Sequence, residues 1–417
     1  MKSYSAYKNS GVSWIGDIPA TWNLSQLRYV IECLDGKRVP VETGLRSEMQ
    51  GSIPYWGAGN IVDYVDRALF DEELVLLGED GAPFFDHTRP VAFHITEPIW
   101  ANNHIHVLRI NQNADPQYIV YALNAVDYKE YINGAILNKL TQSAMNRIKI
   151  PLPPLSVQRK VSECLDGCVN TISNLINEKQ SLIERLQEAS TSIVAETVTK
   201  GLDSNSATKD TGISWLGQVP AHWQVLTNHQ LFAERNIKCA EQDAVLLSVT
   251  KYLGVILQSQ AEELNLATVA PAETTEGYKV VRKGDLVMNI MRAKDGSYGI
   301  SGYDGVISPA YCIYYPRQEV NPQYLYYLFK TPMYMEIFKN YSTGIAEHRM
   351  RLYPVNFFKI PAVVPPLEEQ NEIVAYLDKR VKDIDELISL TQQQIEKLKE
   401  YRQSVISEVV TGKVAVE

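Results

Sequence analysis

The sequence repeats itself once, and this repeat constrains the fold more than any other feature. Residues 11–22 read GVSWIGDIPATW and residues 212–223 read GISWLGQVPAHW, with 7 of 12 positions identical. Further along, DPQYIVYALN at 115–124 returns as NPQYLYYLFK at 321–330. Because the motifs keep their order, we expect two copies of one structural plan rather than a single fold of 417 residues.

A third pair of motifs shows where the copies differ. PPLSVQRKVSECLD at 153–166 returns as PPLEEQNEIVAYLD at 365–378. The distance between equivalent positions grows from 201 to 206 to 212 residues along the three pairs, and it stays at 212 after the PPL motif. The insertions of the second copy therefore lie in its middle, and the segments that follow PPL have equal length.

Each copy ends in a segment of about 45 residues that predicts one long helix. Apolar residues recur there in alternating steps of four and three, which is the pattern of a coiled-coil seam. The residues assigned to the seam are Val161, Leu165, Cys168, Ile172, Leu175, Leu182, Leu186, Ala189 and Ile193 in the first copy, and Ile373, Leu377, Ile384, Leu387, Leu398, Tyr401 and Val405 in the second. Polar residues interrupt the pattern at Lys179, Arg380, Thr391 and Gln394. Since neither helix would be stable alone, we expect the two to pair within the chain.

The segments before these helices predict two α+β globules. Residues 23–150 and 224–360 alternate short β-rich runs with Gly, Asn and Asp turns. The predicted strands are 74–77, 91–95 and 106–110 in the first globule, and 245–249, 285–290 and 310–315 in the second. Short helices are expected after Asp115-Pro116 and Asn321-Pro322, where the first residue can cap a helix and proline suits its first turn. Residues 201–212 are predicted to be a polar linker.

Composition excludes several classes of protein. With 45% hydrophobic and 21% charged residues, the chain is expected to be globular rather than disordered. No apolar run approaches the roughly 18–20 residues that span a bilayer. Five scattered cysteines without a CxxC motif suit a reducing compartment, so we expect a cytoplasmic protein that contacts no membrane. The net charge of −9 excludes bulk electrostatic coating of nucleic acid but permits local basic patches.

The sequence carries no recognisable catalytic site. It has no GxxxxGK[ST] phosphate loop, and Gly57-Ala58-Gly59 is followed by polar turn residues. DPQY and NPQY are similar to the [DN]PP[YF] motif of amino-methyltransferases, but both have glutamine at the third position, and no cofactor-binding glycine motif precedes them. We interpret these motifs as helix caps and expect a chain without catalytic activity of its own.

Histidine and cysteine residues do not form a metal motif. Four histidines fall close together in the first globule, at His87, His94, His104 and His106. No cysteine or carboxylate at ligand spacing completes a site, and the second globule has no equivalent cluster. Cys164 and Cys168 lie one helical turn apart, and we interpret them as core residues rather than ligands. We therefore predict no metal site.

Glycine-punctuated loops that combine polar, basic and aromatic residues point to nucleic acid. Asn, Gln, Arg and Lys can make paired hydrogen bonds to base edges, while Ser and Thr can hold phosphates. The candidates in the first globule are Tyr55, Trp56, Asn60, Asn102, Asn103, His104, Asn138, Lys139, Thr141, Gln142 and Ser143. Those in the second are Arg292, Lys294, Ser297, Tyr298, Ser342, Thr343, His348, Arg349 and Arg351. Basic and acidic residues number 11 against 16 in the first globule and 14 against 13 in the second, so a DNA surface must be a local patch.

The order of these motifs closely resembles the specificity subunit of type I restriction–modification enzymes. SWIGDIPATW or SWLGQVPAHW introduces each globule, KIPLPPL or KIPAVVPPL closes it, and a long helix with Gln158 or Gln370 near its start follows. The resemblance covers nearly the whole chain. It implies an α+β fold in which two α/β target recognition globules are separated by two long helices, packed as an antiparallel coiled coil with a pseudo-twofold internal repeat.

The resemblance also implies domains and partners. We expect target recognition domain 1 at residues 1–152, conserved helix 1 at 153–202, a linker with target recognition domain 2 at 203–364, and conserved helix 2 at 365–417. Each globule would read one half of a bipartite target in double-stranded DNA. Two modification (methyltransferase) subunits and restriction (nuclease/translocase) subunits would dock on the chain. S-adenosylmethionine, ATP and Mg2+ would belong to those subunits, and this chain would bind none of them.

Two alternatives stay open at this point. The chain could be the recognition subunit of a methylation-only or phage-exclusion complex, or it could be a coiled-coil scaffold with two globules that bind ligands other than DNA. Salt-dependent DNA binding in the presence of a methyltransferase partner would exclude the scaffold. The neighbouring genes would separate restriction from methylation alone.

Overall fold

The computed structural model divides the chain into two units. Unit 1 comprises Met1–Leu182 with Leu390–Glu417, and unit 2 comprises Ile183–Ser389. The structure describes residues 3–132, 138–203, 205–241, 243–266, 274–345 and 349–416. No helix within these ranges is long and apolar enough to cross a membrane.

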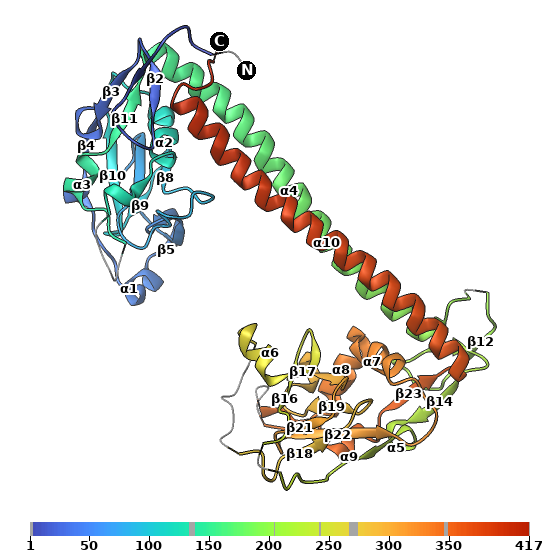
Figure 1. The fold of residues 1–417 in the computed structure, drawn as a ribbon. Coiled ribbons are helices and arrows are strands. Elements are labelled where there is room, and N and C mark those ends of the chain that lie inside the picture. Colours follow the sequence, from blue (N-terminus) through green and yellow to red (C-terminus); the bar gives the residue numbers. More distant parts are fainter. Residues whose placement is uncertain are drawn as a thin grey trace. The chain divides into compact units, whose positions relative to one another are not determined.

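A four-stranded antiparallel sheet forms the centre of unit 1 (Figure 1). Its strand order is β4 (Ile31–Cys33), β10 (Ile105–Ile110), β7 (Leu74–Gly78) and β8 (Ala92–Ile95). Every residue of β7 is buried, as its uninterrupted apolar sequence LVLLG requires. Helix α2 (Pro116–Asn124) packs on β7 and β8, and the Asp115 side chain caps it by accepting a hydrogen bond from the Tyr118 amide at 2.9 Å.

Unit 2 contains the same sheet. Its strand order is β15 (Phe232–Glu234), β22 (Tyr311–Pro316), β19 (Leu286–Asn289) and β20 (Tyr298–Ile300). Helix α7 (Pro322–Lys330) takes the place of α2, and Asn321 caps it by accepting a hydrogen bond from the Gln323 amide at 2.9 Å. The predicted capped helices and the plan of two copies are therefore confirmed.

Two short strand pairs complete the repeated part of each unit. In unit 1, β1 (Tyr7–Asn9) pairs with β2 (Asp17–Pro19), and β3 (Asn23–Gln26) pairs with β11 (Lys149–Leu152). In unit 2, β12 (Thr208–Asp210) pairs with β13 (Gln218–Pro220), and β14 (Gln224–Thr227) pairs with β23 (Pro361–Val364). The prediction of a linker at 201–212 is wrong for its last part, because Thr208–Asp210 form a strand that pairs with β13.

Most of the remaining elements lie in the segments where the two sequence copies diverge, whereas α3 (Gln142–Asn146) and α9 (Pro354–Phe357) take equivalent places before β11 and β23. Unit 1 has α1 (Thr43–Glu48), β5 (Gln50–Trp56), β6 (Ile61–Val65), β9 (Trp100–Ala101), α3 (Gln142–Asn146) and the short 3-10 helices Leu27–Tyr29, Asp35–Lys37 and Tyr128–Glu130. Unit 2 has α5 (Asn228–Leu231), β16 (Leu247–Thr250), β17 (Gly254–Leu257), α6 (Gln258–Glu263), β18 (Lys279–Val281), the 3-10 helix η4 (Ala293–Asp295), β21 (Gly305–Ile307), α8 (Pro332–Tyr341) and α9 (Pro354–Phe357). With β16, all six predicted strands are present, and each end lies within two residues of its predicted position.

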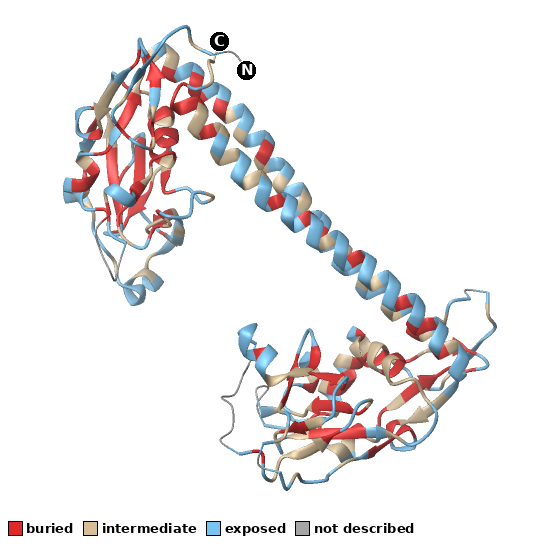
Figure 2. Ribbon diagram, viewed as in Figure 1, coloured by how far each residue is buried: buried red, intermediate tan, exposed pale blue. Residues whose placement is uncertain are grey.

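Each copy ends in a long helix, α4 (Leu155–Lys200) or α10 (Leu367–Val410). In unit 1, Val161 near the start of α4 shares a core with Val410 at the end of α10. In unit 2, Val198 near the end of α4 shares a core with Ile373 near the start of α10. The two helices therefore run antiparallel within each unit, as predicted, and away from the globules they bury mainly the stripe between them (Figure 2).

The buried stripe differs from the predicted seam at every second position. One set of predicted positions is buried or half-buried: Val161, Leu165, Ile172, Leu186, Ile193, Ile373, Leu377, Ile384, Leu398 and Val405. Leu175 and Leu387, by contrast, are 39% and 51% exposed. Cys168, Leu182, Ala189 and Tyr401 are exposed as well. In their place the stripe uses the next residue along, at Val169, Ile176, Ile183, Val381, Ile388 and Ile395. An apolar residue stands at both neighbouring positions at 168/169, 175/176, 182/183 and 387/388, and there the heptad pattern does not choose between them. At 380/381 and 394/395 the predicted position is polar and the observed one is apolar. Because Cys164 is also exposed, the interpretation of Cys164 and Cys168 as core residues is wrong.

Candidate nucleic-acid interface

The predicted DNA-binding loops gather at one edge of each central sheet. In unit 1 the end of β7 lies beside the start of β10, where Gly78 pairs with Ile105. In unit 2 the end of β19 lies beside the start of β22, where Asn289 pairs with Tyr311. Strand order makes these two edges equivalent in the repeat. Loops that follow or precede these strands therefore meet at the same place in both units.

Loop cluster 1, which comprises residues 55–60, 79–81, 101–104 and 138–143, is held together by backbone hydrogen bonds. The Asn102 amide donates to the Trp56 carbonyl at 3.1 Å, which joins the first loop to the third. The Leu140 amide donates to the Glu79 carbonyl at 2.6 Å, which joins the fourth loop to the end of β7. Three loops that the sequence predicts separately thus form one surface.

An ion-pair network lies beneath this surface. Arg38 Nη1 lies 2.6 Å from Glu79 Oε2, and Lys139 Nζ lies 3.1 Å from Glu79 Oε1 and 3.7 Å from Asp80 Oδ2. Asp80 also contacts the ring of His104. The hydrogen bond with Glu79 raises the pKa of Lys139 above its ordinary value, so this side chain keeps its charge. Arg38 belongs to this ion-pair network, although no sequence motif marks it.

Asp35, Glu79 and His106 are the described residues whose arrangement most resembles a metal site. Their potential ligand atoms lie within 4.8 Å of one another. However, the ring nitrogens of His106 contact Asp35 Oδ2 at 2.6 Å and the Leu140 carbonyl at 2.8 Å, and Glu79 contacts Arg38. Burial would raise the pKa of the Asp35 carboxyl, but the hydrogen bond and charge of His106 lower it below its ordinary value. The group is an ion-pair network that positions loops, because its ligand atoms already have partners.

Loop cluster 2, which comprises the described residues 290–298, 342–345 and 349–352, also joins two predicted loops. Thr343 and Arg351 exchange two backbone hydrogen bonds of 3.0 Å, and the Leu352 amide donates to the Ile290 carbonyl at 2.9 Å. Arg292, Arg349 and the side chain of Arg351 are therefore brought to one end of β19, and all three residues are exposed.

The candidates differ in whether a ligand can reach them. Exposed or half-buried candidates are Asn60, Asn103, His104, Asn138, Lys139, Thr141, Gln142, Ser143, Arg292, Lys294, Thr343, Arg349 and Arg351. Buried candidates are Tyr55, Trp56, Asn102, Ser297, Tyr298 and Ser342. Tyr55 stacks on Trp100, and the Tyr298 hydroxyl donates to the Phe329 carbonyl, so these rings support the loops from within. His348 lies outside the described residues.

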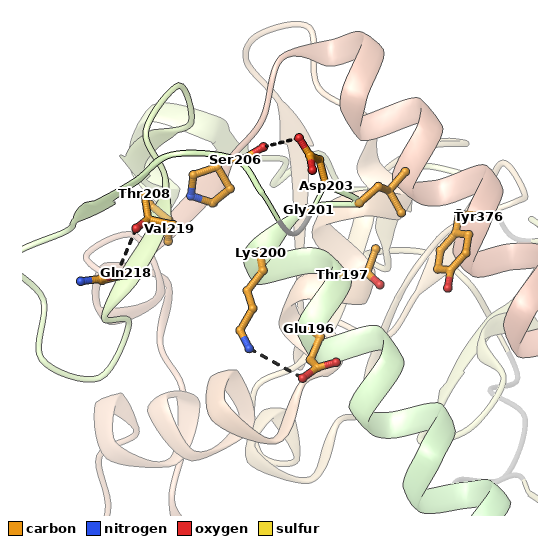
Figure 3. Close-up of a pocket in the computed structure, with 12 residues that line it drawn as sticks. Glu196, Thr197, Lys200, Gly201, Asp203, Ser206, Thr208, Gln218, Val219 and Tyr376 are labelled. Carbon is orange, nitrogen blue, oxygen red and sulfur yellow. Dashed lines mark hydrogen bonds and ion pairs between the residues drawn. The ribbon is translucent and has the colours of Figure 1, made fainter.

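A hollow of about 730 Å³ in unit 2 lies between the end of α4 and β13 (Figure 3). Its polar groups pair with one another, as Lys200 does with Glu196 at 3.7 Å and Ser206 with Asp203 at 3.2 Å. A hollow of about 590 Å³ in unit 1 is lined mainly by apolar side chains, with Cys164 at the position equivalent to Tyr376.

Comparison with known proteins gives one family. The family model described as the type I restriction modification DNA specificity domain matches residues 19–185 and 222–400. A putative type I restriction enzyme specificity subunit from Haemophilus influenzae is 25% identical over 387 residues, covering 90% of this chain and 93% of that protein. The type I restriction enzyme MjaVIII specificity subunit from Methanocaldococcus jannaschii is 22% identical over 430 residues, covering 96% and 94%.

Two solved structures share the fold. One is a chain from a structure that describes complex assembly and conformational transition of the type I R-M system, with a TM-score of 0.65 and 16% identity, covering 95% of this chain and 99% of that one. The other is the HsdS subunit from Thermoanaerobacter tengcongensis, with a TM-score of 0.51 and 16% identity, covering 97% and 100%.

Proposed function

Because this chain belongs to the type I restriction–modification DNA specificity family, we propose that it reads a bipartite target in double-stranded DNA, with one unit for each half-site. The observation that carries the proposal is the pair of loop clusters at equivalent edges of two equivalent sheets. The sheets, capped helices and helix ends repeat, whereas the loops at those edges do not. A common scaffold with different loops is what two different half-sites require.

Within each cluster the exposed side chains suit different parts of a duplex. Asn103, Asn138 and Gln142 carry amides that can pair with base edges, and Lys139 carries a charge for phosphate. In unit 2, Arg292, Arg349 and Arg351 can serve either purpose, since a guanidinium binds guanine or phosphate with two hydrogen bonds. The buried tyrosines and tryptophan of both clusters hold these loops in place.

The proposed partners supply the chemistry. Two modification subunits would hold S-adenosylmethionine, and restriction subunits would hold ATP and Mg2+, so this chain would contribute recognition without catalysis. The apolar hollow of unit 1, which Cys164, Tyr401 and Val414 help to line, supports docking of a partner there. Such a complex would act on DNA in the cytoplasm.

An exchange of loop-bearing segments tests the division of labour. Residues 23–150 would be replaced by those of another family member, and methylated sites would be mapped in cells that carry the partner genes. We expect one half of the methylated sequence to change while the other persists, and the reciprocal exchange of 224–360 to change only the other half. An exchange that alters both halves, with methylation intact, contradicts the proposal.

A further inference from the structure

Lys330, at the end of α7, connects two loops that are remote in sequence. Its Nζ donates to the Lys251 carbonyl at 2.7 Å and to the Gly296 carbonyl at 2.6 Å. Lys251 lies at the tip of the hairpin between β16 and β17, and Gly296 ends the turn that carries Arg292. A single ammonium group therefore fixes the distance between the hairpin tip and loop cluster 2.

Aromatic rings and glycines complete this connection. The ammonium of Lys330 lies 5.0 Å from the centre of the Tyr298 ring and 5.3 Å from that of Tyr326, which are distances of cation–π contacts. Beside it, Gly254 and Gly299 approach so closely that a Cβ on Gly299 would lie 2.7 Å from the Gly254 Cα. The hairpin is thus held against β20 by close backbone packing as well as by Lys330.

The hairpin tip and loop cluster 2 together form a basic surface with one prominent aromatic ring. Tyr252 is 77% exposed, the highest value among the exposed tyrosines, and the Lys251 ammonium lies 5.2 Å from its ring centre. The described residues 249–254, 290–298, 342–345 and 349–352 contain five basic side chains and one acidic side chain. The basic ones are Lys251, Arg292, Lys294, Arg349 and Arg351, and the acidic one is Asp295. Residues 224–360 contain 14 basic and 13 acidic residues in all, so outside this surface acidic residues outnumber basic ones, and the surface is a local basic patch.

We propose that the hairpin tip Lys251-Tyr252 is part of the DNA-contacting surface of unit 2, and that Lys330 is the positioning residue that joins the tip to loop cluster 2. This inference rests on the proposed function. The partner is duplex DNA, because Lys251 and Arg292 are placed to bind phosphates while the exposed Tyr252 ring offers an apolar face and a hydroxyl to a groove. Lys330 acts through the loops and does not itself reach the DNA.

The test uses the full chain in complex with its methyltransferase partner, and a duplex containing a site that the wild-type complex methylates in cells. We expect Tyr252→Ala to weaken binding about tenfold, which is a moderate loss for a contact residue. Lys251→Ala should reduce the slope of the logarithm of the binding constant against the logarithm of the salt concentration by about one. Matched controls are Tyr303→Ala and Lys283→Ala, two exposed residues at the opposite end of β20, which should leave affinity unchanged.

The positioning role of Lys330 has its own readout. Lys330→Met should weaken DNA binding about as much as Tyr252→Ala. The double variant should bind DNA only slightly more weakly than Lys330→Met alone, because both substitutions act through one surface. Lys330→Arg, which keeps donors and charge, should retain most of the affinity. If Lys330→Met prevents folding, Lys330→Arg and the two exposed variants still decide the question.

The outcomes separate this inference from the proposed function. A wild-type complex that neither methylates nor binds any duplex refutes the function itself. A wild-type complex that binds DNA, together with Tyr252→Ala and Lys251→Ala variants that match their controls, refutes the hairpin surface alone. Additive effects of Lys330→Met and Tyr252→Ala would show that Lys330 does not position the tip.

Discussion

Gln158 and Gln370 lie 212 residues apart in the chain and make the same two hydrogen bonds. Gln158 Oε1 accepts from the Asp115 amide at 2.9 Å, and Gln370 Oε1 accepts from the Asn321 amide at 2.8 Å. Each Nε2 donates at 2.8 Å to the carbonyl of the proline five residues earlier. Both glutamines are 1% exposed. Each one therefore ties the start of a long helix to the cap of the short helix that covers the central sheet.

Replacing either glutamine should destabilise its own unit. Gln158→Ala leaves a buried amide and a buried carbonyl without these partners, which should cost about 1–3 kcal/mol in the free energy of unfolding. Gln370→Ala should cost a similar amount, and the two losses should add because the residues share no partner. Urea denaturation followed by tryptophan fluorescence measures both. Gln180→Ala, at an exposed position of α4, is the control, and an equal loss there would contradict the role of Gln158.

Ile172 and Leu175 are both apolar and both belong to the seam predicted from the sequence, so they test which positions of α4 face α10. Ile172 is 8% exposed and Leu175 is 39% exposed. Ile172→Asp should reduce the free energy of unfolding by about 3 kcal/mol or more, because it buries an unpaired carboxylate. Leu175→Asp should cost less than about 1 kcal/mol. The repeat supplies a second pair in unit 2, Ile384→Asp and Leu387→Asp, which should differ in the same direction. Equal losses within either pair would favour the seam predicted from the sequence.

Local patterns in the sequence predict the repeated scaffold well. The strand β7 is recognisable because an uninterrupted apolar run must be buried, and α2 and α7 because Asp115-Pro116 and Asn321-Pro322 are helix starts. The helix seam is only half predictable, since Leu175 and Ile176 are both apolar and only the partner helix decides which one faces inward.

The interface depends on contacts between remote segments, which local patterns do not contain. Tyr298 in a glycine-rich loop has the composition of a DNA-contacting residue, yet it is buried because Phe329 and Lys330 lie over it. Lys330 was missed for the same reason, because its hydrogen-bond partners lie 34 and 79 residues earlier. Tyr252 could have been suspected from its place beside a lysine in a short TKYLG turn.

Arg38 and Lys139 share Glu79 but should respond differently to substitution. The Arg38 side chain is 13% exposed and that of Lys139 is 48% exposed. Arg38→Met should reduce the free energy of unfolding by about 3 kcal/mol, because it leaves a carboxylate in a nearly buried network without its closest cation. Lys139→Met should leave stability almost unchanged but weaken DNA binding by the complex. It should also lower the slope of the logarithm of the binding constant against the logarithm of the salt concentration by about one. Thermal unfolding and fluorescence anisotropy at several salt concentrations distinguish the two. A loss of stability for Lys139→Met equal to that for Arg38→Met would contradict this division.

Lys330 should make the stability of unit 2 depend on pH above neutrality. Burial, and then the charge of Lys251, lower the pKa of Lys330 to about 8, from an ordinary value of 10.5. Between these values the unfolded chain keeps a proton that the folded chain has released, so the stability contributed at this site rises with pH, by at most about 1.4 kcal/mol per pH unit. The rings that face the ammonium do not titrate in this window, because burial raises the pKa of Tyr298 and of Tyr326 above the ordinary value. The free energy of unfolding of the wild type minus that of Lys330→Met should therefore increase from about pH 8 to pH 10.

DNA binding should change in the opposite direction over the same window. Loss of the proton weakens the two hydrogen bonds from Lys330 and removes its attraction to the tyrosine rings, so the hairpin tip is held less firmly against loop cluster 2. The affinity of the wild-type complex for its duplex should fall between pH 7.5 and pH 9.5. Lys330→Arg, whose guanidinium keeps its charge, should show a smaller fall, and Lys330→Met should start weaker and change least. Because the three complexes share every other titrating group, only the differences among their pH profiles report on Lys330. Parallel profiles for all three would show that the protonated amine does not hold the surface together.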